Sequence, residues 1–114
     1  MTLDLEISVE EIEKKIVMRL VGRIDAATSS TLEKKINAFI NEGHLIVILD
    51  FSQIDYLSSA GMRLFLAETK KLIEKEGKLI VFGIVDDVME IIRLAGFEKI
   101  LNICDFETEA LQFG

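Results

Sequence analysis

The segment LIVILDFSQIDYLSSAGM, residues 45–62, decides how the rest of the chain can fold. Its first five residues, 45–49, are all aliphatic, which is typical of a strand that is buried on both faces of a sheet. Apolar side chains then recur from Met62 onward at helical spacing, which predicts a helix over residues 59–76 that ends at a glycine. We expect residues 50–58 to form the loop between this strand and this helix.

The apolar pattern of the remaining sequence predicts four more strands and three more helices. We expect strands at residues 3–9, 14–21, 79–82 and 100–103, a turn at 10–13, and helices at 27–41, from Asp86 to Gly96, and from Asp105 onward, with both aspartates acting as caps. Strands separated by helices are parallel, whereas two strands joined by a short turn are antiparallel. The prediction is therefore one α/β domain over residues 1–114, with a mostly parallel mixed sheet, an antiparallel N-terminal strand and about four helices.

Composition and charge exclude several classes of function. The chain of 114 residues is 50% apolar and 29% charged, which is typical of one globular domain. Its 13 basic and 20 acidic residues give a net charge of −7, so we expect no binding to nucleic acid. No apolar run is long enough for a membrane span. The only cysteine, Cys104, cannot form an internal disulfide, which favours a cytoplasmic location.

No catalytic or metal-binding pattern is evident in the sequence. The only histidine, His44, precedes the strand at 45–49, whereas Ser59 follows its other end, so the two lie roughly 17–20 Å apart and cannot act together. Asp50, Asp55 and the pair 86–87 could hold a loose Mg²⁺, but turn and cap roles are favoured because aspartate prefers such positions. We expect no enzyme activity, no cofactor and no metal.

Asp50 supports an alternative of a different kind. An aspartate that ends a central parallel strand could accept a phosphoryl group, as in receiver domains. Those domains also use an acidic pair after the first strand and a lysine after a later strand. Residues 10–11 follow an alternating, edge-type strand here, and no lysine follows the final strand, so this hypothesis carries little weight.

Ser58 and Ser59 stand where the helix over 59–76 should begin. A serine at a helix start can cap the helix by accepting a backbone hydrogen bond. It can also carry a phosphate, which the free N–H groups and partial positive charge of a helix start tolerate. The two roles are compatible if Ser58 caps and Ser59 is modified. Asp25 has a similar pair of interpretations, as a cap for the helix at 27–41 or as part of a partner-binding surface.

Three short motifs stand out along the chain: Gly22-Arg23-Ile24-Asp25, Leu49-Asp50-Phe51-Ser52-Gln53-Ile54-Asp55-Tyr56-Leu57 and Ser58-Ser59-Ala60-Gly61-Met62. They resemble motifs of the STAS domain family, specifically of the stand-alone bacterial anti-sigma factor antagonists. The order of elements and the length also match the family over essentially the whole chain. The chain departs from the family pattern at Ser58, where many members have aspartate.

The resemblance implies a partner-switching regulator. The unphosphorylated protein would bind an anti-sigma factor serine kinase, phosphorylation would release it, and a phosphatase would reset the switch. It implies Ser59 as phosphoacceptor, with Ser58 as second choice, and a partner-binding surface, for which we select Asp25, Leu57, Ser58, Gly61 and Met62. We expect Leu57 and Met62 to offer exposed apolar side chains to the partner, although Met62 would also suit the core. The alternative within the family is a module that senses a nucleotide or other small molecule, without a sigma-factor role.

Overall fold

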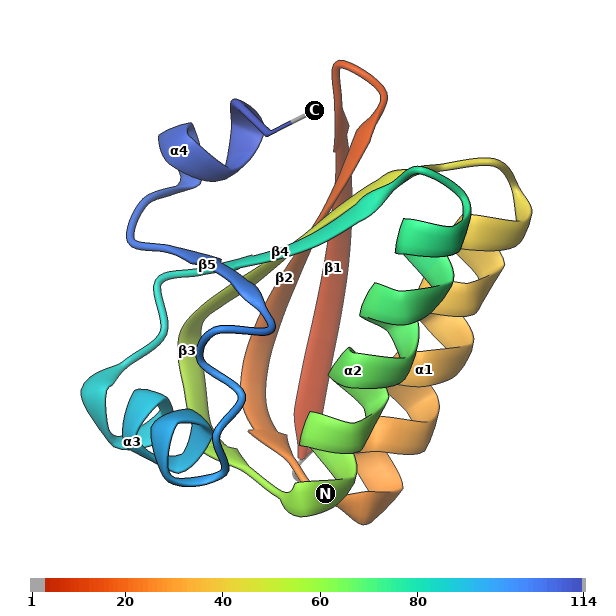
Figure 1. Cartoon of the computed structure of the whole chain (residues 1–114). Helices are drawn as coiled ribbons and strands as arrows, with labels where there is room; N and C mark the ends of the chain where they lie inside the picture. The colour runs from red at the N-terminus through yellow and green to blue at the C-terminus, as the bar shows by residue number, and fades with distance from the viewer. Residues whose placement is uncertain (1–3, 114) are drawn as a thin grey trace.

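The computed structural model describes residues 4–113, and these form five strands and four helices (Figure 1). The elements are β1 (Leu5–Ile12), β2 (Lys15–Ile24), α1 (Ala26–Asn41), β3 (Ile46–Leu57), α2 (Ser59–Glu74), β4 (Lys78–Phe82), α3 (Asp86–Leu94), β5 (Asn102–Cys104) and α4 (Glu107–Leu111). This is the order that the apolar pattern predicts. Residue 3, the expected start of the first strand, lies outside the described residues.

The five strands form one sheet in the order β1-β2-β3-β4-β5. β1 pairs with β2 antiparallel, and the other three pairs are parallel. The predicted fold class is therefore confirmed. The expected turn over residues 10–13 is wrong, because β1 continues to Ile12, which pairs with Lys15. The turn consists of Glu13 and Lys14 alone, both with positive φ, as in the two-residue hairpins whose twist matches that of the sheet.

The central strand β3 is much longer than the sequence predicts. It spans 12 residues and includes most of the stretch that we expected to be a loop. Beyond Asp50 the buried side chains are Phe51, Ile54 and Leu57, a spacing of three that does not look like a strand. Two register shifts against β2 explain this spacing, because each leaves one extra residue on β3. β2 likewise continues through Gly22 to Ile24, where we expected it to break.

Helices cover the two faces of the sheet unequally. Alternate residues of β2 show the division, since Ile16, Met18 and Leu20 belong to the main core with α1, α2 and α3. Val17 belongs to a smaller core on the other face, with Ile48 and the α4 residue Ala110. Figure 1 shows α1 and α2 side by side on the same side of the sheet. The main core therefore supports α2, the helix that begins at Ser59.

Arg19 links α4 to the sheet face that carries the smaller core. The Arg19 guanidinium lies 2.6 Å from a carboxylate oxygen of Glu107, 3.3 Å from Asp50 and 3.2 Å from Glu10. Hydrogen bonding from Arg19 lowers the pKa of the Glu107 carboxyl below its usual value. Asp50, which lies in β3, is therefore part of a structural ion-pair network on the sheet face opposite α1 and α2.

Two expected helix caps are wrong. α3 begins at Asp86 itself, and the preceding Val85 occupies the cap position without a side-chain hydrogen bond. α4 begins after Phe106 rather than after Asp105, and the Phe106 N–H donates to the Glu109 carboxylate at 3.2 Å. Carboxylates in the first turn of each helix instead interact favourably with the partial positive charge of the helix start.

Candidate functional site

Ser58 caps α2 and leaves Ser59 exposed. The Ser58 hydroxyl accepts a hydrogen bond from the Gly61 N–H at 3.2 Å, and the Ser58 N–H donates to the Ile24 carbonyl at 2.8 Å. The hydroxyl and the backbone N–H of Ser58 therefore both form structural hydrogen bonds, and the residue is half-buried. Ser59 is the first residue of α2 and is exposed to solvent. Of the two adjacent hydroxyls, that of Ser59 is the more accessible to a reagent.

Asp25 caps α1 at the same end of the sheet. Its carboxylate accepts a hydrogen bond from the Thr28 N–H at 2.9 Å, and its own N–H donates to the Thr28 hydroxyl at 2.8 Å. The Thr28 backbone hydrogen bond is the main reason that the pKa of Asp25 lies below its usual value. Because Ile24 pairs with Leu57, the start of α1 lies beside the start of α2. The fold thus brings Asp25, Ser58 and Ser59 together, as the sequence predicts.

Leu57 and Met62 lie in the core rather than on a docking surface. Their side chains are only 2% and 7% exposed, so the expectation of exposed apolar contacts is wrong for Leu57, and Met62 takes the core role that we also considered. Gly61 is buried beneath them. A Cβ on Gly61 would lie 2.6 Å from the Leu57 Cδ1 and 2.8 Å from the Ile24 Cγ2, so only glycine lets α2 start this close to the sheet. These residues position Ser59 by packing.

Arg23 and Tyr56 are the exposed pair that sequence reasoning missed. They face each other across β2 and β3, one residue before the buried pair Ile24 and Leu57. The Arg23 guanidinium lies 4.8 Å from the centre of the Tyr56 ring and 3.5 Å from the Asp25 carboxylate. Tyr56 is 40% exposed. The alternation of exposed and buried residues at the ends of the two paired strands was the signal that could have revealed this pair. It could be recognised only once residues 50–57 were known to be a strand.

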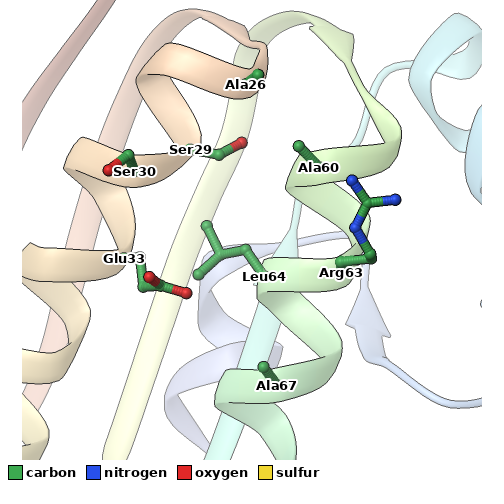
Figure 2. Close-up of a pocket in the computed structure, with 8 residues that line it drawn as sticks. All are labelled: Ala26, Ser29, Ser30, Glu33, Ala60, Arg63, Leu64 and Ala67. Atoms are coloured by element: carbon green, nitrogen blue, oxygen red, sulfur yellow. The ribbon is translucent and has the colours of Figure 1, made fainter.

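A groove runs between the N-terminal halves of α1 and α2, with a volume of about 370 Å³ (Figure 2). It is lined by Ala26, Ser29, Ser30, Glu33, Ala60, Arg63, Leu64 and Ala67. Small residues line most of it, so the two helices leave space between them. Ser29 is 6% exposed, and its hydroxyl has no hydrogen-bond partner within residues 4–113. The groove begins beside the first turn of α2, immediately after Ser59.

His44 lies far from the two serines. It stands just before β3, whereas Ser58 follows the end of that strand, so the two lie at opposite ends of the strand, as predicted. The His44 ring instead contacts Phe39 edge to face, with ring centres 5.8 Å apart.

The positions of the aspartates do not support metal binding or a receiver site. Among residues 4–113 no group of three histidine, cysteine, aspartate or glutamate side chains is arranged to hold a metal ion. Asp50 lies inside β3 and not at its end. Its carboxylate accepts hydrogen bonds of 3.0 and 2.7 Å from the Ser52 N–H and hydroxyl. The receiver hypothesis thereby loses its geometric basis. Over the same described residues, no helix has the length and apolar character required for a membrane span.

Comparison with known proteins agrees with the motifs around Ser59. The family model described as "STAS domain" matches residues 6–110. The chain belongs to the STAS domain family. A curated relative, BtrV of Bordetella bronchiseptica, is named as a candidate anti-sigma factor antagonist and is 28% identical over 101 residues, covering 89% of this chain and 87% of its own.

Solved STAS structures share the same architecture. An anti-sigma factor antagonist from Mycobacterium paratuberculosis superposes with a TM-score of 0.85 at 26% identity, covering 94% of this chain and 91% of its own. The antagonist SpoIIAA in its unphosphorylated form gives a TM-score of 0.79 at 22% identity, with 93% of each chain covered. SpoIIAA of Bacillus has also been solved in a phosphorylated form, with a TM-score of 0.70 at 21% identity, covering 93% of this chain and 96% of its own. At this identity SpoIIAA shows the fold alone.

Proposed function

We propose that this STAS protein is an anti-sigma factor antagonist that is switched by phosphorylation of Ser59. The observation that carries the proposal is the difference between two adjacent serines: Ser58 caps α2, whereas Ser59 is exposed. The curated relatives are named as anti-sigma factor antagonists, and SpoIIAA exists in a phosphorylated and an unphosphorylated form. The partner is an anti-sigma factor that is itself a serine kinase.

The phosphate comes from ATP and Mg²⁺ bound by the partner. The Ser59 hydroxyl oxygen attacks the γ-phosphorus, the bond to the β-phosphate oxygen breaks, and ADP leaves. The hydroxyl proton passes to a base of the kinase. Within residues 4–113, His44 lies at the other end of β3, and the nearby Asp25 carboxylate is engaged in capping α1, so neither serves as a base for Ser59. The chain is therefore the substrate and has no catalytic role of its own. A separate phosphatase restores the hydroxyl by hydrolysis, and all three proteins act in the cytoplasm.

Phosphorylation ends binding through charge, with the fold preserved. The phosphate adds about −1.5 to −2 charges at the centre of the proposed contact surface. The helix start tolerates this charge, because its N–H groups and dipole favour an anion. Asp25, Ser58 and Ser59 form the polar part of this surface, and the exposed Arg23 and Tyr56 extend it. Desolvation of the added charge in an interface weakens affinity on the order of a hundredfold or more.

Labelling with the kinase tests the proposal. Incubation with the anti-sigma kinase and ATP should place one phosphate on Ser59, and Ser59→Ala should abolish labelling. Ser58→Ala is the matched control, and it should still be labelled. Label that persists in Ser59→Ala and disappears in Ser58→Ala would move the acceptor to Ser58. The phosphoserine bond should survive hydroxylamine, whereas rapid loss of label would indicate an acyl phosphate.

Binding of the kinase measures the switch itself. Ser59→Ala should keep its affinity for the anti-sigma factor, and Ser59→Asp should lose part of it because a carboxylate carries less charge than a phosphate. The Asp variant should melt within a few degrees of the wild type. A large drop in melting temperature with unchanged affinity would show that Ser59 is needed for the fold and is not a switch.

A further inference from the structure

We propose that Arg63 binds the phosphate on Ser59 and holds it in its doubly ionised form. This inference rests on the proposed phosphorylation of Ser59. It adds a residue that neither the sequence motifs nor the comparisons single out. Three features support this role: the helical spacing of the two residues, the direction of the Arg63 side chain, and a guanidinium with no other partner among residues 4–113.

Arg63 is four residues after Ser59 on α2. Residues at this spacing lie on the same side of a helix, with Cβ atoms about 5–6 Å apart, and an anion that precedes a cation is the favoured orientation. Long side chains on helices point back toward the N-terminus. Figure 2 shows Arg63 doing so, with its guanidinium beside the first turn of α2 at the level of Ala60. Its reach therefore includes the position of a phosphate on Ser59.

The Arg63 guanidinium is available for such a partner. Within the described part of the chain, it forms no ion pair and no side-chain hydrogen bond. Glu33 lines the same groove from α1 and is not paired with it. By contrast, Arg19, Arg23 and Arg93 each pair with at least one carboxylate. Among the contacts of residues 4–113, Arg63 is the arginine left with all five N–H donors free, and a guanidinium can hold a phosphate through two parallel hydrogen bonds.

A second polar group lines the same groove from α1, across from Arg63. The Ser29 hydroxyl extends from α1 toward α2 and, although buried, has no hydrogen-bond partner among residues 4–113 (Figure 2). Buried hydroxyls are normally hydrogen-bonded. This end of the groove is therefore suited to a polar group.

The consequence for the switch is electrostatic. The second pKa of phosphoserine is about 6, so some of the phosphate is singly charged near neutral pH. A bound guanidinium favours the dianion and lowers that pKa. Phosphorylation would then place the full double charge in the partner surface and also engage a cation that was free before. Ser58 is five residues before Arg63, on a different side of the helix, so a phosphate there would not gain this contact.

Phosphorus NMR on protein with phosphoserine incorporated at position 59 during synthesis tests the proposal. The chemical shift is followed from pH 4.5 to 8 in the wild type, Arg63→Gln, Arg63→Lys and Arg23→Gln. We expect the second phosphate pKa to be higher in Arg63→Gln than in the wild type by about 0.5, with Arg63→Lys in between. Arg23→Gln is the matched control, since it removes another arginine near the same helix start, and it should leave the phosphate pKa unchanged.

Equal phosphate pKa values in the wild type and Arg63→Gln would overturn the proposal, as would a rise in Arg23→Gln alone. The difference should shrink in 0.5 M salt, because an exposed ion pair is screened. Circular dichroism melts confirm that each variant is folded. Since the phosphoserine is built in, the result does not depend on any kinase. Failure of kinase labelling would defeat the proposed function, whereas failure of the titration would defeat only the role of Arg63.

Discussion

The Ser58 hydroxyl accepts a hydrogen bond of 3.2 Å from the Gly61 N–H, and this contact separates the roles of two adjacent serines. Ser58 is held at the junction of β3 and α2, while Ser59 begins the helix with an exposed side chain. In the sequence either residue could cap the helix, and the family resemblance makes Ser59 the first choice for phosphorylation and Ser58 the second. The hydrogen bond assigns capping to Ser58 and leaves the Ser59 hydroxyl accessible.

The first prediction concerns the stability of the two serine variants. Ser58→Ala removes the cap and should lower the free energy of unfolding by about 1 kcal/mol. Ser59→Ala removes an exposed hydroxyl and should change it by less than about 0.5 kcal/mol. Urea unfolding of both variants measures the difference. The reverse order of stabilities would mean that Ser59 is the cap, which would also contradict its role as phosphoacceptor.

The second prediction concerns the close contact at Gly61. Gly61→Ala places a methyl group 2.6 Å from the Leu57 side chain and 2.8 Å from that of Ile24, so one of them must move. We expect a loss of about 1–3 kcal/mol in the free energy of unfolding, as for overpacked cores. Glycine to alanine within an open helix would instead stabilise by about 1 kcal/mol.

Ala67→Gly is the matched control for Gly61→Ala, because Ala67 is an exposed position on the same helix. It should lose about 1 kcal/mol, the ordinary cost of glycine in a helix. Glycine would then be preferred at position 61 and alanine at position 67 of one helix. A Gly61→Ala variant that is more stable than the wild type would show that α2 can move away from Leu57 without loss.

The third prediction concerns Glu68, which lies fully buried between α1 and α2. The Lys71 ammonium is 3.2 Å from one carboxylate oxygen, and the other has no hydrogen-bond partner in the described residues. Burial raises the pKa of Glu68 despite the opposing effect of Lys71, with Glu33 adding to the rise and Asn37 opposing it. The folded state thus favours the protonated acid, so the free energy of unfolding falls as pH rises from the usual glutamate pKa through the raised one.

Glu68→Gln imitates the protonated form at every pH. We expect it to be more stable than the wild type at pH 7.5 by on the order of 1 kcal/mol, with the difference disappearing near pH 4. Urea unfolding at both values measures this. Glu74→Gln, at an exposed position of α2, should show no such pH dependence. A Glu68→Gln variant that loses stability at pH 7.5 would show that the Lys71 pair outweighs the cost of burial.

Much of the local structure near the site could be read from residue types. The apolar run at residues 45–49 marks the central strand, and the spacing after Met62 marks α2. Gly22 to Asp25 and Ser58 to Met62 mark the two helix starts that meet at the site. Asp25 caps α1 as its residue type suggests, because capping needs only the side chain and the next turn of backbone.

Long-range pairing decided what local patterns could not. Residues 50–57 look like a loop because their buried residues recur every third position. Their pairing with β2 makes them a strand, and the two register shifts in that pairing account for the unusual spacing. The exposed pair at the strand ends is therefore Arg23 and Tyr56, with Leu57 in the core. Asp50 follows the apolar run in sequence but binds Arg19 in the middle of the sheet.

The sequence by itself determined the order of elements along the chain, the mostly parallel orientation of the strands with an antiparallel N-terminal strand, and the place of the helix start that carries Ser59. These depend on apolar periodicity and on residues close together in the chain. Only the tertiary structure decided which serine caps, which apolar residues are buried and which arginine lacks a partner. Exposure and ion pairing depend on side chains from distant segments, such as Ile24 against Gly61, and a one-dimensional pattern does not contain those contacts.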